Sequence, residues 1–208
     1  LNADGSDFIK QSGISKSSDR TIMLQFQLNY NRRFGKHNVG GMLMYMQRDF
    51  KSDVLPHRNQ GLSGRFTYDY DQRYLVEFNF GYNGTERLAK KDRFELFPAV
   101  SLGWVISNEK FFETFLDKID NLKIRASYGL VGSDETGSGA GSYLYRDNVE
   151  LNSIGYTTGS GWNVTNKGPK ILQYAIANAT WERARKLDIG LDITMFRNLH
   201  ITADYFHE

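Results

Sequence analysis

The sequence contains no cysteine among its 208 residues. A disulfide framework and a thiolate metal site are therefore excluded, whereas an oxidising compartment of the cell envelope is compatible with the composition. Proline occurs only 3 times. No apolar run approaches the roughly 18 residues that a membrane-spanning helix needs. Lys and Arg form no run, and a formal net charge of +2 with a pI ≈ 8.7 gives no indication of a nucleic-acid partner.

These absences leave room for a membrane protein that crosses with strands. The mean hydropathy is only -0.52, but a transmembrane barrel alternates apolar and polar residues, so its average hydropathy is low. Aromatic residues make up 14% of the chain, with 14 Phe and 12 Tyr, and there are 20 Gly. This composition suits long strands with aromatic girdles, and it suits a soluble all-β protein equally well.

The clearest pattern lies in residues 61–83, GLSGRFTYDYDQRYLVEFNFGYN. Every second residue is apolar in two runs of about ten residues, which predicts two strands with one apolar and one polar face. The residues that share the apolar face are Leu62, Gly64, Phe66, Tyr68 and Tyr70, then Tyr74, Val76, Phe78, Phe80 and Tyr82. The turn residues between the runs predict an antiparallel hairpin. Runs of about ten residues are near the length that spans a bilayer as a tilted strand.

The same alternation predicts further strands at 21–34, 39–48, 96–106, 122–131, 187–195 and 199–205. Residues 107–120 have helical spacing of their Phe, Leu and Ile residues, and Ser107 or Asn108 could cap such a helix. Residues 1–20, 49–60, 84–95 and 132–180 are expected to be loops. The connections alternate between a few residues and ten or more, apart from the expected helix.

Alternating short turns and long loops are typical of an outer-membrane barrel, whose short turns face the periplasm and whose long loops face outside. We therefore expect an all-β fold, an antiparallel transmembrane β-barrel segment. Two alternatives stay open at this point. One is a passive porin-like or small closed eight-stranded barrel, and the other is a soluble carbohydrate-binding β-sandwich.

Four stretches of the sequence resemble the barrel of the SusC/RagA family of TonB-linked (TonB-dependent) outer-membrane transporters. They are RNQGLSGRFTYDYDQRYLVEFNFGYNGTERL, FELFPAVSLGWVISNEKFF, LDKIDNLKIRASYGLVGSD and ATWERARKLDIGLDITMFRNLHITADYF, which occur in the family's order and cover most of residues 20–206. The resemblance implies a barrel of about 22 strands, of which this chain would supply about eight. Residues 1–208 are then part of a single barrel domain, with residues 133–180 as a long extracellular loop. The plug, the TonB-contacting segment and the last strands are expected to lie outside this sequence.

The resemblance also implies a function and a location. The protein would reside in the outer membrane of a bacterium, in contact with its lipid, and import a bulky nutrient, glycan or peptide, without enzymatic chemistry or a cofactor. A SusD-like surface lipoprotein would cap the barrel, and TonB would act through the missing regions.

Within the long loop, four aromatic residues are the candidate contacts for substrate or partner: Tyr143, Tyr145, Tyr156 and Trp162. Aromatic faces stack on sugars and peptide side chains. The alternative is that these residues pack the loop against itself or against a covering partner.

Other patterns indicate no chemistry. The glycine-rich residues 129–141 lack the Gly-Lys-Ser/Thr ending of a phosphate loop. The four histidines, His37, His57, His200 and His207, have no metal-ligand spacing. Asp69, Asp71 and Glu77 are expected on a hairpin tip and a polar face, where solvated carboxylates are ordinary, so catalysis is not predicted.

Overall fold

The computed structural model describes residues 18–51, 56–115, 118–135 and 143–208. Ten strands account for most of them: β1 (Arg20–Phe34), β2 (His37–Lys51), β3 (His57–Tyr70), β4 (Tyr74–Thr85), β5 (Phe94–Val105), β6 (Ile119–Ser133), β7 (Asn148–Thr158), β8 (Val164–Gln173), β9 (Glu182–Met195) and β10 (Leu199–His207). Two short 3-10 helices, η1 (Ile106–Asn108) and η2 (Lys110–Phe115), follow β5. No helix in the described part of the chain is both long and apolar enough to cross a membrane.

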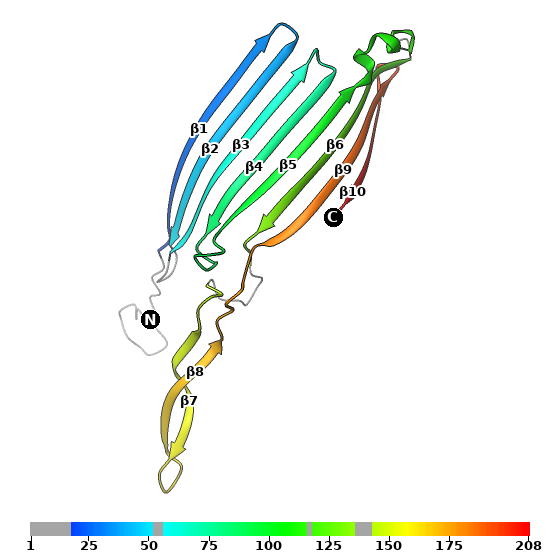
Figure 1. Ribbon diagram of the computed structural model, residues 1–208. Helices are drawn as coiled ribbons and strands as arrows, with labels where there is room; N and C mark the ends of the chain where they lie inside the picture. Colours follow the sequence, from blue (N-terminus) through cyan, green and yellow to red (C-terminus); the bar gives the residue numbers. More distant parts are fainter. Residues whose placement is uncertain (1–17, 52–55, 116–117, 136–142) are drawn as a thin grey trace, which may run out of the picture.

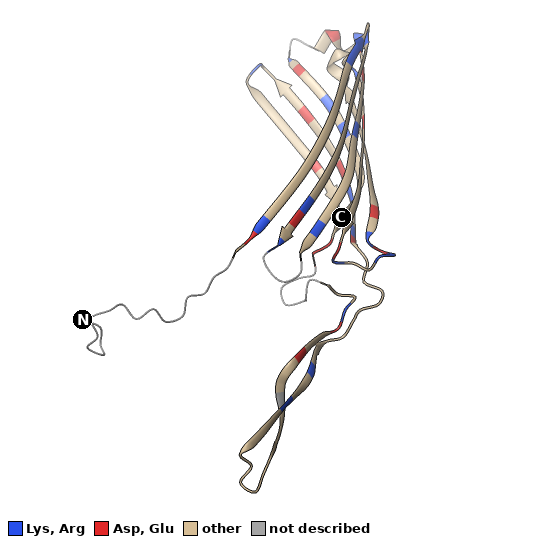
Figure 2. Cartoon of the chain, turned by 90° about the vertical axis from the view of Figure 1, so that its left-hand side faces the viewer, with Lys and Arg blue, Asp and Glu red and all other residues tan. Residues whose placement is uncertain are grey.

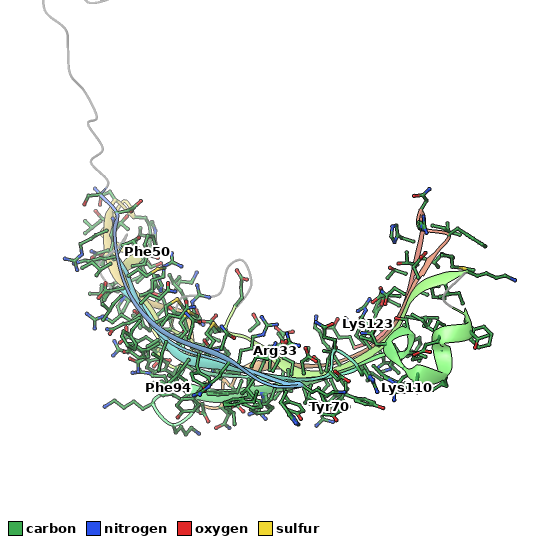
Figure 3. All side chains as sticks on the ribbon, turned by 90° about the horizontal axis from the view of Figure 1, so that it is seen from above. Arg33, Phe50, Tyr70, Phe94, Lys110 and Lys123 are labelled. Atoms are coloured by element: carbon green, nitrogen blue, oxygen red, sulfur yellow. The ribbon has the colours of Figure 1, made fainter. Side chains whose placement is uncertain are left out.

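Eight strands form one antiparallel sheet in the order β1-β2-β3-β4-β5-β6-β9-β10 (Figure 1). The strands are 9 to 15 residues long, which is long enough to cross a bilayer at a tilt. The sheet bends into an open arc, with β1 and β10 at its two edges (Figure 3). The described strands therefore form neither a small closed barrel nor a sandwich, because this sheet does not close and no second layer faces it.

The two faces of the arc differ in chemistry, as the alternation predicts. Directly paired residues share a face, and one such row runs Tyr45, Leu62, Tyr82 and Leu96 across four strands. The neighbouring position on each strand carries polar residues, for example the row Thr67, Glu77, Ser101 and Ser127. Figure 3 places Tyr70 and Phe94 on the convex side and Arg33 and Lys123 on the concave side. The convex face is therefore apolar and the concave face polar.

Many large apolar side chains of the convex face are exposed, including Phe66, Phe78 and Leu102. An uncovered apolar surface of this extent is not typical of a soluble protein. Aromatic pairs border it at both ends. Tyr74 stacks between Tyr70 and Trp104 with centroid distances of 6.5 and 6.4 Å. At the opposite end, Tyr82 stacks on Phe94 at 5.4 Å. Such girdles mark the two water interfaces of a transmembrane barrel.

All short turns lie at one end of the sheet, which we call the turn end. Gly35 and Lys36 join β1 to β2, and residues 71–73 join β3 to β4, where Asp71 and Gln72 have φ values of 54° and 57°. The opposite end, the loop end, carries residues 86–93 and the long connection 134–181. The expected loop at 49–60 is shorter than predicted. β2 and β3 stay paired to Phe50 and His57, and a 2.9 Å salt bridge between Arg58 and Asp49 crosses this extension.

The expected helix at 107–120 is wrong in type, because residues 106–115 form only the two 3-10 helices. No side chain caps η1. Ser107 instead donates to the Asn121 side chain at 3.1 Å, and Asn108 donates to the carbonyl of Gln72 at 2.7 Å. These two bonds tie the start of the segment to β6 and to the turn between β3 and β4. The segment therefore forms two short helical turns rather than one continuous helix.

The second sheet was not predicted. Strands β7 and β8 pair only with each other and form a hairpin within the expected loop 133–180. This hairpin extends away from the loop end of the main sheet (Figures 1 and 2). Residues Ser133 and Glu182, on either side of the connection, are themselves register partners in β6 and β9. The wall is thus continuous without the hairpin.

Candidate functional site at the loop end

The four candidate aromatic residues separate into two pairs. Tyr143 and Tyr145 lie at the base of the long connection, where both are half-buried. Tyr156 and Trp162 lie on the hairpin, with 69% and 75% of their surface exposed. The sequence placed all four in one loop, but the structure does not bring them together into one site.

Tyr143 is a packing residue of the loop base. Its hydroxyl donates to the carbonyl of Pro56 at 2.5 Å, and its ring stacks on His57 at 6.0 Å with an interplanar angle of 9°. Tyr145 meets the Tyr143 ring edge-on at 6.1 Å. Burial, and next the charge of Glu86, raise the pKa of Tyr143, so the phenol keeps its proton and remains a donor at neutral pH. This pair fits the packing alternative.

A small apolar core anchors the other end of the connection. Leu88, Phe97 and Trp181 are its buried members. Trp181 meets Phe97 edge-on at 5.3 Å and donates its indole N–H to the carbonyl of Arg93 at 3.2 Å. The Phe97 ring lies so close to Gly132 that a Cβ there would sit 2.0 Å from it. This core fills the place where the pairing of β5 with β6 stops at Ala99 and Gly129.

Sequence reasoning did not assign Trp181 this role. The sequence shows only that Trp181 stands just before a strand and next to a polar run. The residues that it contacts, such as Phe97 and Arg93, are far from it in the sequence. Polar contacts add to the anchor, as Arg183 pairs with Glu95 at 2.8 Å and Lys91 donates to the Asn178 side chain at 3.3 Å. The base is thus held by both packing and charge.

The tip of the hairpin has the opposite character. Trp162 has φ = 52°, in the left-handed region, and its N–H donates to the carbonyl of Gly159 at 3.1 Å in a tight turn. Tyr156, close to the tip, and Leu151, nearer the base of the hairpin, are also largely exposed. A bulky residue held in a left-handed conformation costs free energy, and such conformations cluster at functional sites. The tip therefore presents apolar surface with nothing in the described chain packed over it.

The concave face carries ion pairs. Arg65 pairs with Glu77 at 2.5 Å, and Asn79 donates to the same carboxylate at 2.7 Å. Further along, one guanidinium contacts three carboxylates: Arg125 pairs with Asp188 at 3.2 Å, with Asp192 at 3.4 Å and with Asp204. This face can make many polar contacts with whatever lies inside the arc.

The carboxylates singled out from the sequence have structural partners. Asp69 accepts the N–H of Gln72 at 2.7 Å and so caps the hairpin turn. Asp71 pairs with Lys36 at 2.9 Å and Arg73 at 3.2 Å, and Glu77 pairs with Arg65. Each of these carboxylates thus has a partner in the turn or on the concave face.

The residues with described positions contain no group of three or more His, Asp or Glu side chains that could hold a metal ion. His37 contacts Tyr68 at 2.8 Å and His200 contacts Thr194 at 3.1 Å. Within the glycine-rich stretch, residues 136–142 lie outside the described residues.

Comparison with known proteins identifies the wall. No family model matches the chain. TonB-dependent receptor P39 of Formosa agariphila is 29% identical over 156 residues, 74% of this chain and 14% of that protein. TonB-dependent receptor SusC of Bacteroides thetaiotaomicron is 31% identical over 140 residues, 67% of this chain and 13% of that protein. The chain belongs to the SusC/RagA family of TonB-dependent receptors. It spans only a small part, 12% to 20%, of the curated relatives it matches.

Solved structures agree in fold. The RagAB peptide importer in its closed-closed state superposes with a TM-score of 0.73 at 18% identity, covering 90% of this chain and 23% of that one. The open-open state gives a TM-score of 0.64 at 17% identity, with 91% and 23% covered. The sheet is thus a segment of a TonB-dependent receptor barrel in the bacterial outer membrane. The relatives are receptors rather than enzymes.

Proposed function

We propose that the full-length protein imports a bulky nutrient, a glycan or a peptide, across the outer membrane in a TonB-dependent manner. The same proposal includes a SusD-like surface lipoprotein that covers the extracellular end, where the β7–β8 hairpin is the contact element. The observation that carries it is the exposure of Tyr156 and Trp162 near the tip of this hairpin. The hairpin itself extends away from the wall (Figure 2).

The division of the long connection supports this proposal. The base of the connection is anchored through Tyr143 and Trp181, and we call this anchored base the root of the hairpin. The tip of the hairpin leaves apolar surface uncovered. Large aromatic side chains provide much of the contact energy in protein interfaces and stack on sugar rings. Import of peptides is stated for RagAB, and either nutrient class would suit an aromatic tip.

The test removes the hairpin and keeps its root. Asn148 and Gln173 are register partners, so residues 149–172 can be replaced by Asn-Gly, a favoured two-residue turn. We expect a barrel that still shows heat-modifiable gel migration but no longer copurifies with its surface lipoprotein or supports uptake of its nutrient. Uptake and copurification at the wild-type level would contradict the role of the hairpin.

Point variants refine the result. The double variant Tyr156→Ser and Trp162→Ser should weaken copurification of the lipoprotein, whereas Tyr174→Ser, an equally exposed aromatic residue outside the hairpin, should not. Uptake that persists in cells lacking TonB would favour the passive, porin-like alternative.

A further inference from the structure

The connection between β5 and β6 is the exception among the turn-end connections, because it contains a compact helical segment. Residues 106–115, which we call the rim segment, comprise η1 and η2. Two of its aromatic side chains are exposed, Phe111 at 64% and Phe115 at 58%, whereas Phe112 between them is buried at 7%. The strand pairing of the main sheet does not involve these two exposed rings.

Contacts place the rim segment over the convex side of the sheet. Its Glu109 accepts the indole N–H of Trp104 at 3.2 Å and the hydroxyl of Tyr74. Both aromatic residues belong to the turn-end girdle on the apolar face. Arg73 approaches the same carboxylate at 3.4 Å, which balances its charge. Figure 3 shows Lys110, from the same segment, on the convex side.

The surface formed in this way is amphipathic. Phe111 and Phe115 are exposed on a segment that is hydrogen-bonded to the girdle of the convex face through Glu109, and the exposed Lys110 adds a cation to the same segment. A short segment that combines aromatic rings with a long basic side chain suits the boundary between acyl chains and phosphate groups. Because the short turns of outer-membrane barrels face the periplasm, the lipid expected at the turn end is the inner leaflet of the outer membrane.

We propose that the rim segment is an interfacial anchor that binds phospholipid of the periplasmic leaflet. Phe111 and Phe115 enter the acyl-chain boundary, and Lys110 contacts headgroup phosphate. The anchor fixes the depth of this part of the wall, independently of what the receptor transports. The occupant is a lipid surface, because the segment is continuous with the lipid-facing side and linked to its girdle.

The experiment measures depth in the membrane. A single cysteine is placed at Phe115 in the full-length receptor, in a background free of other cysteines, and carries an environment-sensitive fluorophore. Gln72→Cys, on the neighbouring periplasmic turn, is the matched control. The protein is reconstituted in nanodiscs of phosphatidylethanolamine and phosphatidylglycerol, with or without brominated acyl chains. Thr114→Cys, which keeps both Phe rings, replaces Phe115→Cys if gel migration shows misfolding.

We expect brominated lipid to quench the rim-segment label several-fold more strongly than the Gln72 label, and aqueous iodide to show the reverse order. Equal access of iodide to both labels would overturn the proposal and favour a periplasmic protein as the partner of Phe111 and Phe115. A label protected from both quenchers would also overturn it, since the residue would then be covered by the receptor itself.

Discussion

Val100 and Ser101 are neighbours on β5, yet they face opposite sides of the wall. Val100 is paired with Phe78 and Tyr128 in a convex apolar row, and Ser101 with Glu77 and Ser127 in a concave polar row. One residue of displacement thus changes the surroundings from lipid to the barrel interior, because the side-chain period of a strand is two.

Arginine substitutions at these two positions test the assignment of the faces. Val100→Arg should lower folding stability by roughly 2–4 kcal/mol, the cost of a cation near the bilayer midplane. Ser101→Arg should be far milder, because the new cation points into the interior beside Glu77. Folding of the receptor into liposomes under urea titration measures both. Similar losses for the two variants would contradict the alternation.

The carboxylates at the turn end predict a dependence on pH. Hydrogen bonding from Lys36 lowers the pKa of Asp71, and hydrogen bonds from Tyr74 and Trp104 lower the pKa of Glu109. Groups with lowered pKa stabilise the folded state at pH values above their ordinary range, and this contribution is lost as pH falls through the lowered pKa. Acid should therefore loosen the connections at the turn end, where Asp71 and Glu109 lie outside the membrane-spanning strands.

We expect amide hydrogen exchange in the turns near Asp71 and Glu109, corrected for its intrinsic pH dependence, to keep its protection above the ordinary carboxyl range and to lose it as the pH falls below about 4. The double variant Asp71→Asn and Glu109→Gln should show a flatter response, since it removes both titrating groups. An unchanged acid response in this variant would assign the effect to other residues.

At the scale of elements, the strands with clear alternation were predicted and the β7–β8 hairpin was not. β7 reads Val149, Leu151 and then Tyr156, so its alternation changes phase, and the pairing shifts register around Ser153. β8 contains Gly168 and Pro169, which suggested a loop. The bulges and the proline are tolerated because this hairpin pairs only with itself and belongs to no wall.

The residues that anchor the hairpin could not be predicted from the sequence either. Trp181, Phe97 and Leu88 come from three different connections or strands, and nothing in their local patterns indicates that they meet. The helical spacing at 107–120 was misleading for a related reason. The bonds of Asn108 and Glu109 to other elements decide that segment's shape, and such long-range contacts override local spacing.

Two tryptophans of the same connection test the division into root and tip. Trp181→Ala should destabilise the root by about 3–5 kcal/mol, the usual cost of removing a buried large aromatic side chain. Trp162→Ala, at the exposed tip, should stay within about 0.5 kcal/mol. Limited proteolysis of residues 134–181, together with urea unfolding, compares them. Equal protease sensitivity of both variants and the wild type would show that Trp181 does not anchor the connection.

At the scale of the whole molecule, the sheet has the two faces and the two different ends of a barrel wall between two compartments. Its polar concave face, with Arg125 among three aspartates, is arranged for the interior of a barrel, and its apolar convex face for lipid. The turns and the rim segment gather at one end and the long connection at the other (Figure 1). These features together predict one orientation of the wall in the outer membrane, with the turns in the periplasm and the long connection outside.

Labelling of intact cells tests this orientation. Single cysteines are placed at Ser160 on the hairpin, at Lys91 in the 86–93 loop and at Gln72 in a short turn of the full-length receptor. A membrane-impermeant maleimide should label Ser160→Cys and Lys91→Cys on intact cells, and Gln72→Cys only after the outer membrane is permeabilised. Labelling of Gln72→Cys from outside, with protection of Ser160→Cys, would contradict the account.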